Sequence, residues 1–116
     1  MTAAVRNLVI EQGATYEQGL VYNDSAGDPI DLTGCTARMH IREAYDSEAE
    51  IIELTTENGR ITLGGVLGTI VLYIADEDTE LLDFSSARYD LELVLPSGRV
   101  TRLLRGKVKL LLEVTK

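Results

Sequence analysis

Residues 89–105 read Tyr-Asp-Leu-Glu-Leu-Val-Leu-Pro-Ser-Gly-Arg-Val-Thr-Arg-Leu-Leu-Arg. Over residues 89–95 an apolar side chain recurs at every second position, which is the period of a β-strand whose alternate side chains point to opposite faces. Pro-Ser-Gly at residues 96–98 is typical of a turn, and residues 99–105 predict the returning strand. We therefore expect a β-hairpin with one face against a core.

The same period extends through most of the chain. Leu8 and Ile10 share one parity, which predicts another strand with one buried face. Residues 68–75 are apolar on both faces, which indicates a central or covered strand. The strand expected over residues 107–114 is too apolar for an open edge, so we expect it to be paired. In the strand predicted over residues 35–45, the side chains expected to face the core are Cys35, Ala37, Met39 and Ile41.

Turn signals separate these strands. Residues 30–34, which follow a loop rich in Asn, Asp and Gly, are interpreted as a corner that leads the chain from one sheet to the other. Residues 57–60, Glu-Asn-Gly-Arg, favour a hairpin, and the glycines at 64–65 favour a second one. The alternation breaks over residues 76–84, which predicts one short helical turn. Its expected cap is Asp76, Asp78 or Thr79.

The fold class follows from this spacing. About eight short strands at intervals of about 8–12 residues predict a β-sandwich or barrel rather than strands that alternate with helices. We expect an all-β, antiparallel, immunoglobulin-like β-sandwich that forms a single domain over residues 1–116. A chain of this length buries roughly two thirds of its unfolded surface, enough for one core.

Composition excludes several functions. With 19 acidic and 11 basic residues the net charge is −8, which disfavours a nucleic-acid partner. No stretch approaches the ~20 apolar residues that cross a bilayer, and residues 1–12 lack the apolar core of a secretory signal. We therefore expect neither a membrane nor a nucleic-acid partner, and synthesis in a reducing cytoplasm, as the single cysteine also suggests.

Charge is unevenly distributed along the chain. Residues 43–57 and 76–83 are acidic, whereas residues 99–109 contain five bases and no acid. These runs are either solvated strand faces and loops or complementary patches that meet across subunits. In the second interpretation the partner interface consists of Arg38, Arg42, Arg99, Arg102, Arg105, Lys107 and Lys109.

Residues with catalytic potential do not form a recognisable constellation. Cys35 and His40 lie five residues apart on one predicted strand and point to opposite faces, which favours a buried apolar cysteine and a surface histidine without an orienting carboxylate. The serines lie in predicted loops without a nucleophile elbow. Residues 64–68 are Gly-rich but match no phosphate-binding pattern. The acids of 76–83 lack the EF-hand spacing, although a cation there stays an alternative. We expect no catalytic residue, cofactor, metal or small-molecule substrate.

Three segments, in this order and spacing, resemble a known family. Residues 13–42 include an extended strand, the corner Gly-Asp-Pro-Ile-Asp-Leu-Thr-Gly and then Ala-Arg-Met-His-Ile-Arg. Residues 88–93 read Arg-Tyr-Asp-Leu-Glu-Leu, and residues 98–108 followed by Glu-Val-Thr at 113–115 form the closing hairpin. Together they resemble the N-terminal domain of phage baseplate upper proteins and small virion proteins encoded near tail genes.

The resemblance implies a role without catalysis. It implies a phage virion structural protein, a tail- or baseplate-associated subunit that acts through contacts with other virion proteins, is present as a homo-oligomer, and is made in the host bacterial cytoplasm before it joins the virion. A capsid decoration (cement) protein, a carbohydrate- or receptor-binding module and a small enzyme are the alternatives. Within the resemblance, Leu32 closes one end of the core, and Tyr89 places its hydroxyl on a backbone acceptor.

Overall fold

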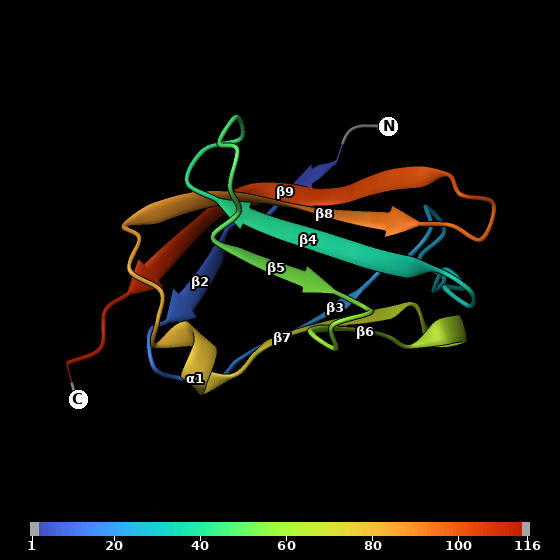
Figure 1. Cartoon of the computed structure of the whole chain (residues 1–116). Helices are drawn as coiled ribbons and strands as arrows, with labels where there is room; N and C mark the ends of the chain where they lie inside the picture. Colours follow the sequence, from blue (N-terminus) through green and yellow to red (C-terminus); the bar gives the residue numbers. More distant parts are fainter. Residues whose placement is uncertain (1–2, 115–116) are drawn as a thin grey trace.

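The computed structural model describes residues 3–114 as two β-sheets that face each other across one apolar core (Figure 1). The larger sheet has the order β1-β9-β8-β4-β5, with β2 also paired to β9, and the smaller has the order β3-β7-β6. The strands are β1 (Ala4–Val5), β2 (Leu8–Glu11), β3 (Tyr16–Val21), β4 (Thr36–Arg42), β5 (Ile52–Thr55), β6 (Ile61–Leu63), β7 (Thr69–Ile74), β8 (Ser86–Val94) and β9 (Val100–Leu111).

The structure confirms the two-residue period of the buried side chains. In β8 every second residue from Ala87 to Leu93 is buried, and in β4 Ala37, Met39 and Ile41 are buried in the same way. The strand expected to be central or covered is β7, the middle strand of the smaller sheet, and β9 is paired on both sides. Side chains from both sheets therefore meet in one core, and the prediction of an all-β sandwich is confirmed.

Within the described residues the chain passes from one sheet to the other between β2 and β3, between β3 and β4, between β5 and β6, and between β7 and β8. This order of crossings is typical of immunoglobulin-like sandwiches. The crossing between β3 and β4 is the predicted corner: Leu32 is buried, and the Thr33 amide donates to Asp31 Oδ1 at 2.9 Å. Gly34 ends the corner with φ +80°, a conformation that strains other residues.

Residues 57–60 do not form the expected hairpin. They connect β5 of the larger sheet to β6 of the smaller one, so the strands on either side are not hydrogen-bonded to each other. The Asn-Gly pair makes a tight turn here, with Gly59 at φ +80°, and a tight turn serves a crossing as well as a hairpin. The second expected hairpin does form, between β6 and β7, around the 3₁₀ turn η1 (Gly65–Leu67).

The sheet pairing is not wholly antiparallel. β1 and β2 run parallel to β9, with Ala4 beside Leu104 and Leu8 beside Val108. Tyr89 fixes this N-terminal segment from inside the core, because its hydroxyl donates to the Arg6 carbonyl at 2.7 Å. The expected backbone acceptor for Tyr89 is thus confirmed.

The predicted helical turn is α1 (Asp76–Thr79), but the expected caps are wrong. Ala75 occupies the N-cap position without a side-chain hydrogen bond, and the three acids that follow face the positive end of the turn. Thr79 has another role, since it is fully buried and its hydroxyl accepts from the Gly13 amide at 3.1 Å and donates to the Ala14 carbonyl at 2.9 Å. It therefore joins α1 to the turn between β2 and β3.

Candidate functional site

The outward-facing side chains of β4, β8 and β9 form a charged face on the larger sheet. The strand register aligns them in rows that run across the three strands. One row places Glu92 between Arg38 and Arg102, and the next places Asp90 between His40 and Arg105. Opposite charges directly across a strand pair attract each other, so the Glu92 row stabilises the sheet, whereas Asp90 forms its ion pair diagonally with Arg102.

Glu92 is the centre of the ion-pair network. Its two carboxylate oxygens accept from Arg38 Nε at 2.8 Å and from Arg102 Nη2 at 3.2 Å, and Arg102 Nε lies 3.3 Å from Asp90 Oδ2. Partial burial opposes ionisation of Glu92, but the hydrogen bonds from Arg38 and Arg102 outweigh it and lower the pKa of this carboxyl. The network therefore favours a charged Glu92.

A β-bulge makes the charged face continuous. Leu91 pairs with Leu104, but Glu92 pairs with Arg102, so that Leu103 is an extra residue in β9. Arg102 and Arg105 have opposite parity in the sequence, yet both are exposed across from the acids of β8. Alternation alone would place them on different faces.

The next row contains only cations. Arg42 lies beside Arg88, and Arg88 lies beside Lys107. Arg42 is bound by the loop that follows β4. Its Nη2 lies 3.7 Å from Glu50 Oε2, and its Nη1 donates to the carbonyl oxygens of Ser47 and Glu48. The ion pairs among residues 3–114 do not include the other cations of this face, which are Arg88, Arg105, Lys107 and Lys109. They form the basic strip of the charged face.

The predicted interface residues thus divide into three groups. Arg38, Arg42 and Arg102 are engaged within the chain, Arg99 lies in the β8–β9 hairpin, and the other three belong to the basic strip. Sequence reasoning missed Arg88. The signal was present, because Arg88 has the same parity in β8 as Asp90 and Glu92.

Two expectations for single residues need correction. His40 does have a carboxylate partner: Nε2 lies 2.8 Å from Glu53 Oε2, across the β4–β5 pairing, and Nδ1 lies 2.9 Å from Arg42 Nη2. Cys35 is partly exposed rather than buried, since it follows Gly34 at the end of the sandwich and packs only against the margin of the core. The pKa of its thiol is raised by desolvation and by Asp31, which disfavours the thiolate.

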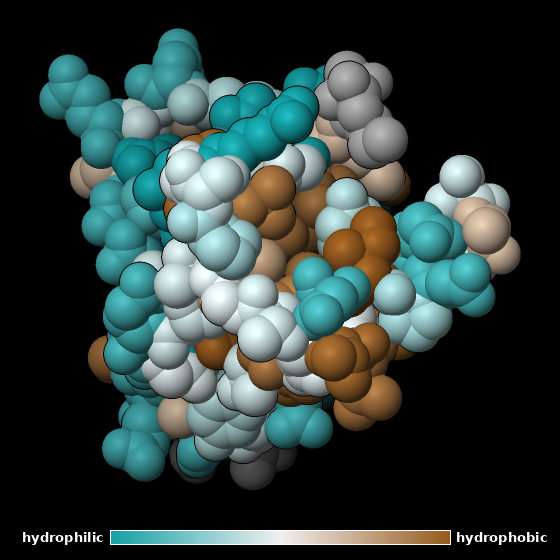
Figure 2. Space-filling model, turned by 90° about the vertical axis from the view of Figure 1, so that its right-hand side faces the viewer, coloured by the Kyte–Doolittle hydropathy of each residue, from teal (hydrophilic) through white to brown (hydrophobic). Residues whose placement is uncertain are grey.

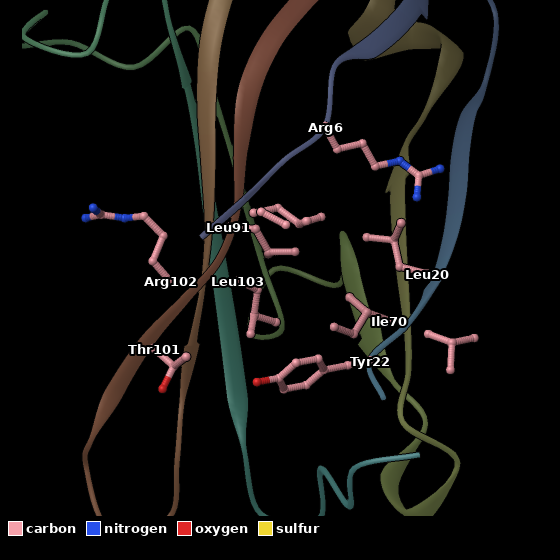
Figure 3. Close-up of a pocket in the computed structure, with 11 residues that line it drawn as sticks. Arg6, Leu20, Tyr22, Ile70, Leu91, Thr101, Arg102 and Leu103 are labelled. Atoms are coloured by element: carbon pink, nitrogen blue, oxygen red, sulfur yellow. The ribbon is translucent and has the colours of Figure 1, made fainter. Parts of the chain in front are cut away.

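An apolar slot opens between the two sheets at one side of the sandwich, with a volume of about 270 Å³. Leu91 and Leu103 of the larger sheet point across it toward Leu20 and Ile70 of the smaller sheet (Figure 3). Tyr22, which directly follows β3, lies on the same side as Leu20 and Ile70. Arg6 extends across its margin, whereas Arg102 points away (Figure 3). The remaining lining residues are Ala4, Val21, Thr101 and Leu104. Such a slot favours apolar contact rather than acid–base chemistry.

Hydrophobic residues are also exposed near the slot. Figure 2 shows hydrophobic side chains gathered at the end of the molecule that carries η1 and the β8–β9 hairpin. Val66 and Leu67 of η1 are 66% and 64% exposed, and Val21 at the end of β3 is 58% exposed. This end of the sandwich therefore offers an apolar surface to a partner.

Within the part of the chain that the structure describes, no group of three or more His, Cys, Asp or Glu side chains is placed to hold a metal ion. The same residues include no helix with the length and apolar character that a bilayer crossing requires. The two surfaces that stand out are thus the charged face and the apolar slot.

Neither a protein-family model nor a curated protein sequence matches the chain. Among solved structures, one from work on multimeric cell-adhesive interactions of VGSC beta subunits is similar, with 14% identity and a TM-score of 0.48, over 96% of this chain and 93% of the other. Drosophila OTK, extracellular domains 3–5, is 12% identical with a TM-score of 0.43, over 97% of this chain and 34% of the other. By the strand order of its own two sheets, the chain is an immunoglobulin-like β-sandwich.

Proposed function

We propose that the protein is a non-catalytic structural subunit of a phage particle, positioned at the tail or baseplate, that works through contacts with other virion proteins. The observation that carries the proposal is the basic strip. Four cations of an acidic protein lie together on one face of the larger sheet, outside the ion-pair network that engages their neighbours. A surface of this kind attracts an acidic surface of a partner and fixes its orientation.

The resemblance of three segments to phage baseplate upper proteins supports the choice of partner. The corner at residues 30–34 closes the end of the sandwich through Leu32, and Tyr89 binds the N-terminal segment, so both motifs have folding roles. The outer surface is left for contacts. The proposal places the protein in the virion after its synthesis in the bacterial cytoplasm, without a cofactor, nucleic acid or small-molecule substrate.

The test locates the protein on assembled particles with a label and compares variants in which the basic strip is mutated. Lys107→Gln with Lys109→Gln removes two positive charges from the charged face. A matched control, Thr62→Glu with Leu81→Glu, changes the net charge by the same amount on exposed positions of β6 and the segment after α1. Incorporation into particles is measured by immunogold labelling and by the amount of protein that sediments with them.

We expect labelling at the tail or baseplate, and a loss of incorporation for the lysine variant but not for the control. Label on the capsid surface would assign the decoration role instead. Particles without label, or equal incorporation of both variants, would refute the proposed use of the basic strip. Binding in a glycan array would indicate the carbohydrate-binding alternative.

A further inference from the structure

The strand β3 forms an unusually open edge of the smaller sheet. The β5 edge is covered by side chains, since Asn58 Nδ2 and Arg60 Nη1 both donate to the Glu53 carbonyl and the Thr55 amide donates to Asn58 Oδ1. The β6 edge is only three residues long. β3 has six residues and lies at the end of its sheet. Edge strands are usually shortened or covered because their free backbone groups pair with other chains.

The backbone groups that β3 leaves free can be identified from its pairing with β7. The Tyr22 amide donates to the Gly68 carbonyl at 2.8 Å, and the register then assigns the β7 hydrogen bonds to every second residue of β3. Glu17, Gly19 and Val21 consequently direct their amides and carbonyls to the open edge. Among the described residues, the hydrogen bond found there is the one from Gln18 Nε2 to the Gly19 carbonyl, at 3.1 Å.

The surroundings of this edge are apolar. Leu20 of β3 and Tyr22, which directly follows β3, line the slot, which opens beside the strand (Figure 3). Val21 is exposed at the end of the same strand, and the exposed Val66 and Leu67 lie just before its pairing partner β7. A strand added to β3 would therefore gain backbone hydrogen bonds and cover apolar side chains at the same time.

We infer that β3 pairs with β3 of a second copy of this chain, antiparallel and across a two-fold axis at Gly19. In this register Gly19 faces the partner's Gly19, and Glu17 faces the partner's Val21. The three residues with free groups on each strand make about six main-chain hydrogen bonds. The two smaller sheets then form one continuous sheet, and the two slots open toward the shared axis.

Two features of the chain fit a second copy as the occupant. Gly19 has no side chain, and a Cβ there would meet no atom of this chain within 4 Å, so no side chain obstructs the sheet face at the two-fold axis. The only charged residue of β3 is Glu17, and the two-fold axis places it opposite a valine rather than opposite its own copy.

Cysteine cross-linking tests the register. In a Cys35→Ser background, Gly19→Cys places two cysteines across the axis at a Cα separation of about 5.5 Å, within disulfide range. Glu17→Cys is the matched control on the same strand, because the Cα atoms of its two copies lie about 14 Å apart in this register. We expect rapid disulfide formation for Gly19→Cys and none above background for Glu17→Cys. Equal rates, or faster cross-linking of Glu17→Cys, would overturn the register.

A charge swap tests the same contact without a covalent bond. Val21→Glu places two glutamates opposite each other at both ends of the pairing and should raise the dimer dissociation constant about tenfold. Glu17→Lys added to it should restore dimerisation, while Val9→Glu on the exposed side of β2 should leave it unchanged. Sedimentation equilibrium gives the constants, and thermal unfolding verifies that each variant is folded.

The inference rests on the proposed function and extends it by naming one partner, a second copy of the chain. The dependence of binding on salt concentration distinguishes the two. Each copy carries a net charge of −8, so screening should strengthen the β3 dimer, whereas it should weaken a contact made by the basic strip. A chain that stays monomeric at millimolar concentration, or whose slot takes up an apolar dye without dimerisation, would overturn the inference. Particle labelling would still decide the proposed function on its own.

Discussion

Tyr16 and Tyr89 are both buried, yet removal of their hydroxyl groups should change stability in opposite directions. The Tyr89 hydroxyl donates to the Arg6 carbonyl at 2.7 Å and ties the N-terminal segment to the core. The Tyr16 hydroxyl is buried and has no hydrogen-bond partner among the described residues. Tyr89→Phe loses a hydrogen bond worth about 1 kcal/mol, whereas Tyr16→Phe removes a buried polar group whose unmet desolvation costs about 1 kcal/mol or more.

The two variants should therefore differ by about 2 kcal/mol in the free energy of unfolding. For a chain of this size that difference corresponds to roughly 8 °C in Tm, with Tyr16→Phe the more stable variant. Urea unfolding at pH 7 measures the free energies, and an unchanged m-value verifies that the denatured state is the same. Destabilisation of equal size in both variants would refute the reasoning, because it would mean that the two hydroxyl groups do not differ in hydrogen bonding.

The same residues predict a response to alkali. Burial raises the pKa of each tyrosine to about 12. The unfolded state ionises near pH 10, so stability from these groups is complete below that pH and is lost as pH rises toward 12. Each Phe variant should reduce the slope of unfolding free energy against pH in this range. A slope that is unchanged in both variants would contradict the assignment.

Three further changes test other contacts. Thr79→Val keeps the shape but leaves the Gly13 amide without its acceptor, so it should destabilise by about 2 kcal/mol, more than Thr79→Ser, in urea unfolding. Glu92→Gln should cost about 1 kcal/mol at pH 7; because the pKa of Glu92 is lowered in the folded state, this difference should shrink as pH falls below the ordinary glutamate pKa and disappear in acid. Gly106→Ala places a Cβ against the Arg6 backbone, so it should displace the N-terminal segment and accelerate hydrogen exchange there; unchanged exchange would contradict the close approach.

Local pattern predicted the strands and their buried faces, because alternation depends only on neighbouring residues. Pairing between strands that are distant in the sequence produces no comparable pattern in the sequence. Residues 57–60 carry the turn chemistry of a hairpin, but the same chemistry serves a crossing between sheets. The parallel pairing of β1 and β2 with β9 joins segments about a hundred residues apart, and the sequence alone does not reveal that register.

Only the local part of the charged face could be predicted, because its long-range pairing is not visible in the sequence. The basic run 99–109 is visible in the sequence, but its cross-strand partners are not. Arg38 and Arg102 meet Glu92 only because β4, β8 and β9 are neighbours, and the bulge at Leu103 sets which side of β9 each base occupies. The apolar slot and the open β3 edge depend on the arrangement of the two sheets, so neither was expected from residue order.

The parallel pairing of β2 with β9 affects the order of folding during translation. On the ribosome, Leu8 and Ile10 emerge about a hundred residues before Val108 and Leu110 of the strand that flanks them. The polypeptide must therefore keep β2 unpaired until β9 has been made, and closure of the larger sheet becomes a long-range step of the kind that folds slowly. A nascent-chain arrest before β9 should leave a protease-sensitive, chaperone-bound intermediate.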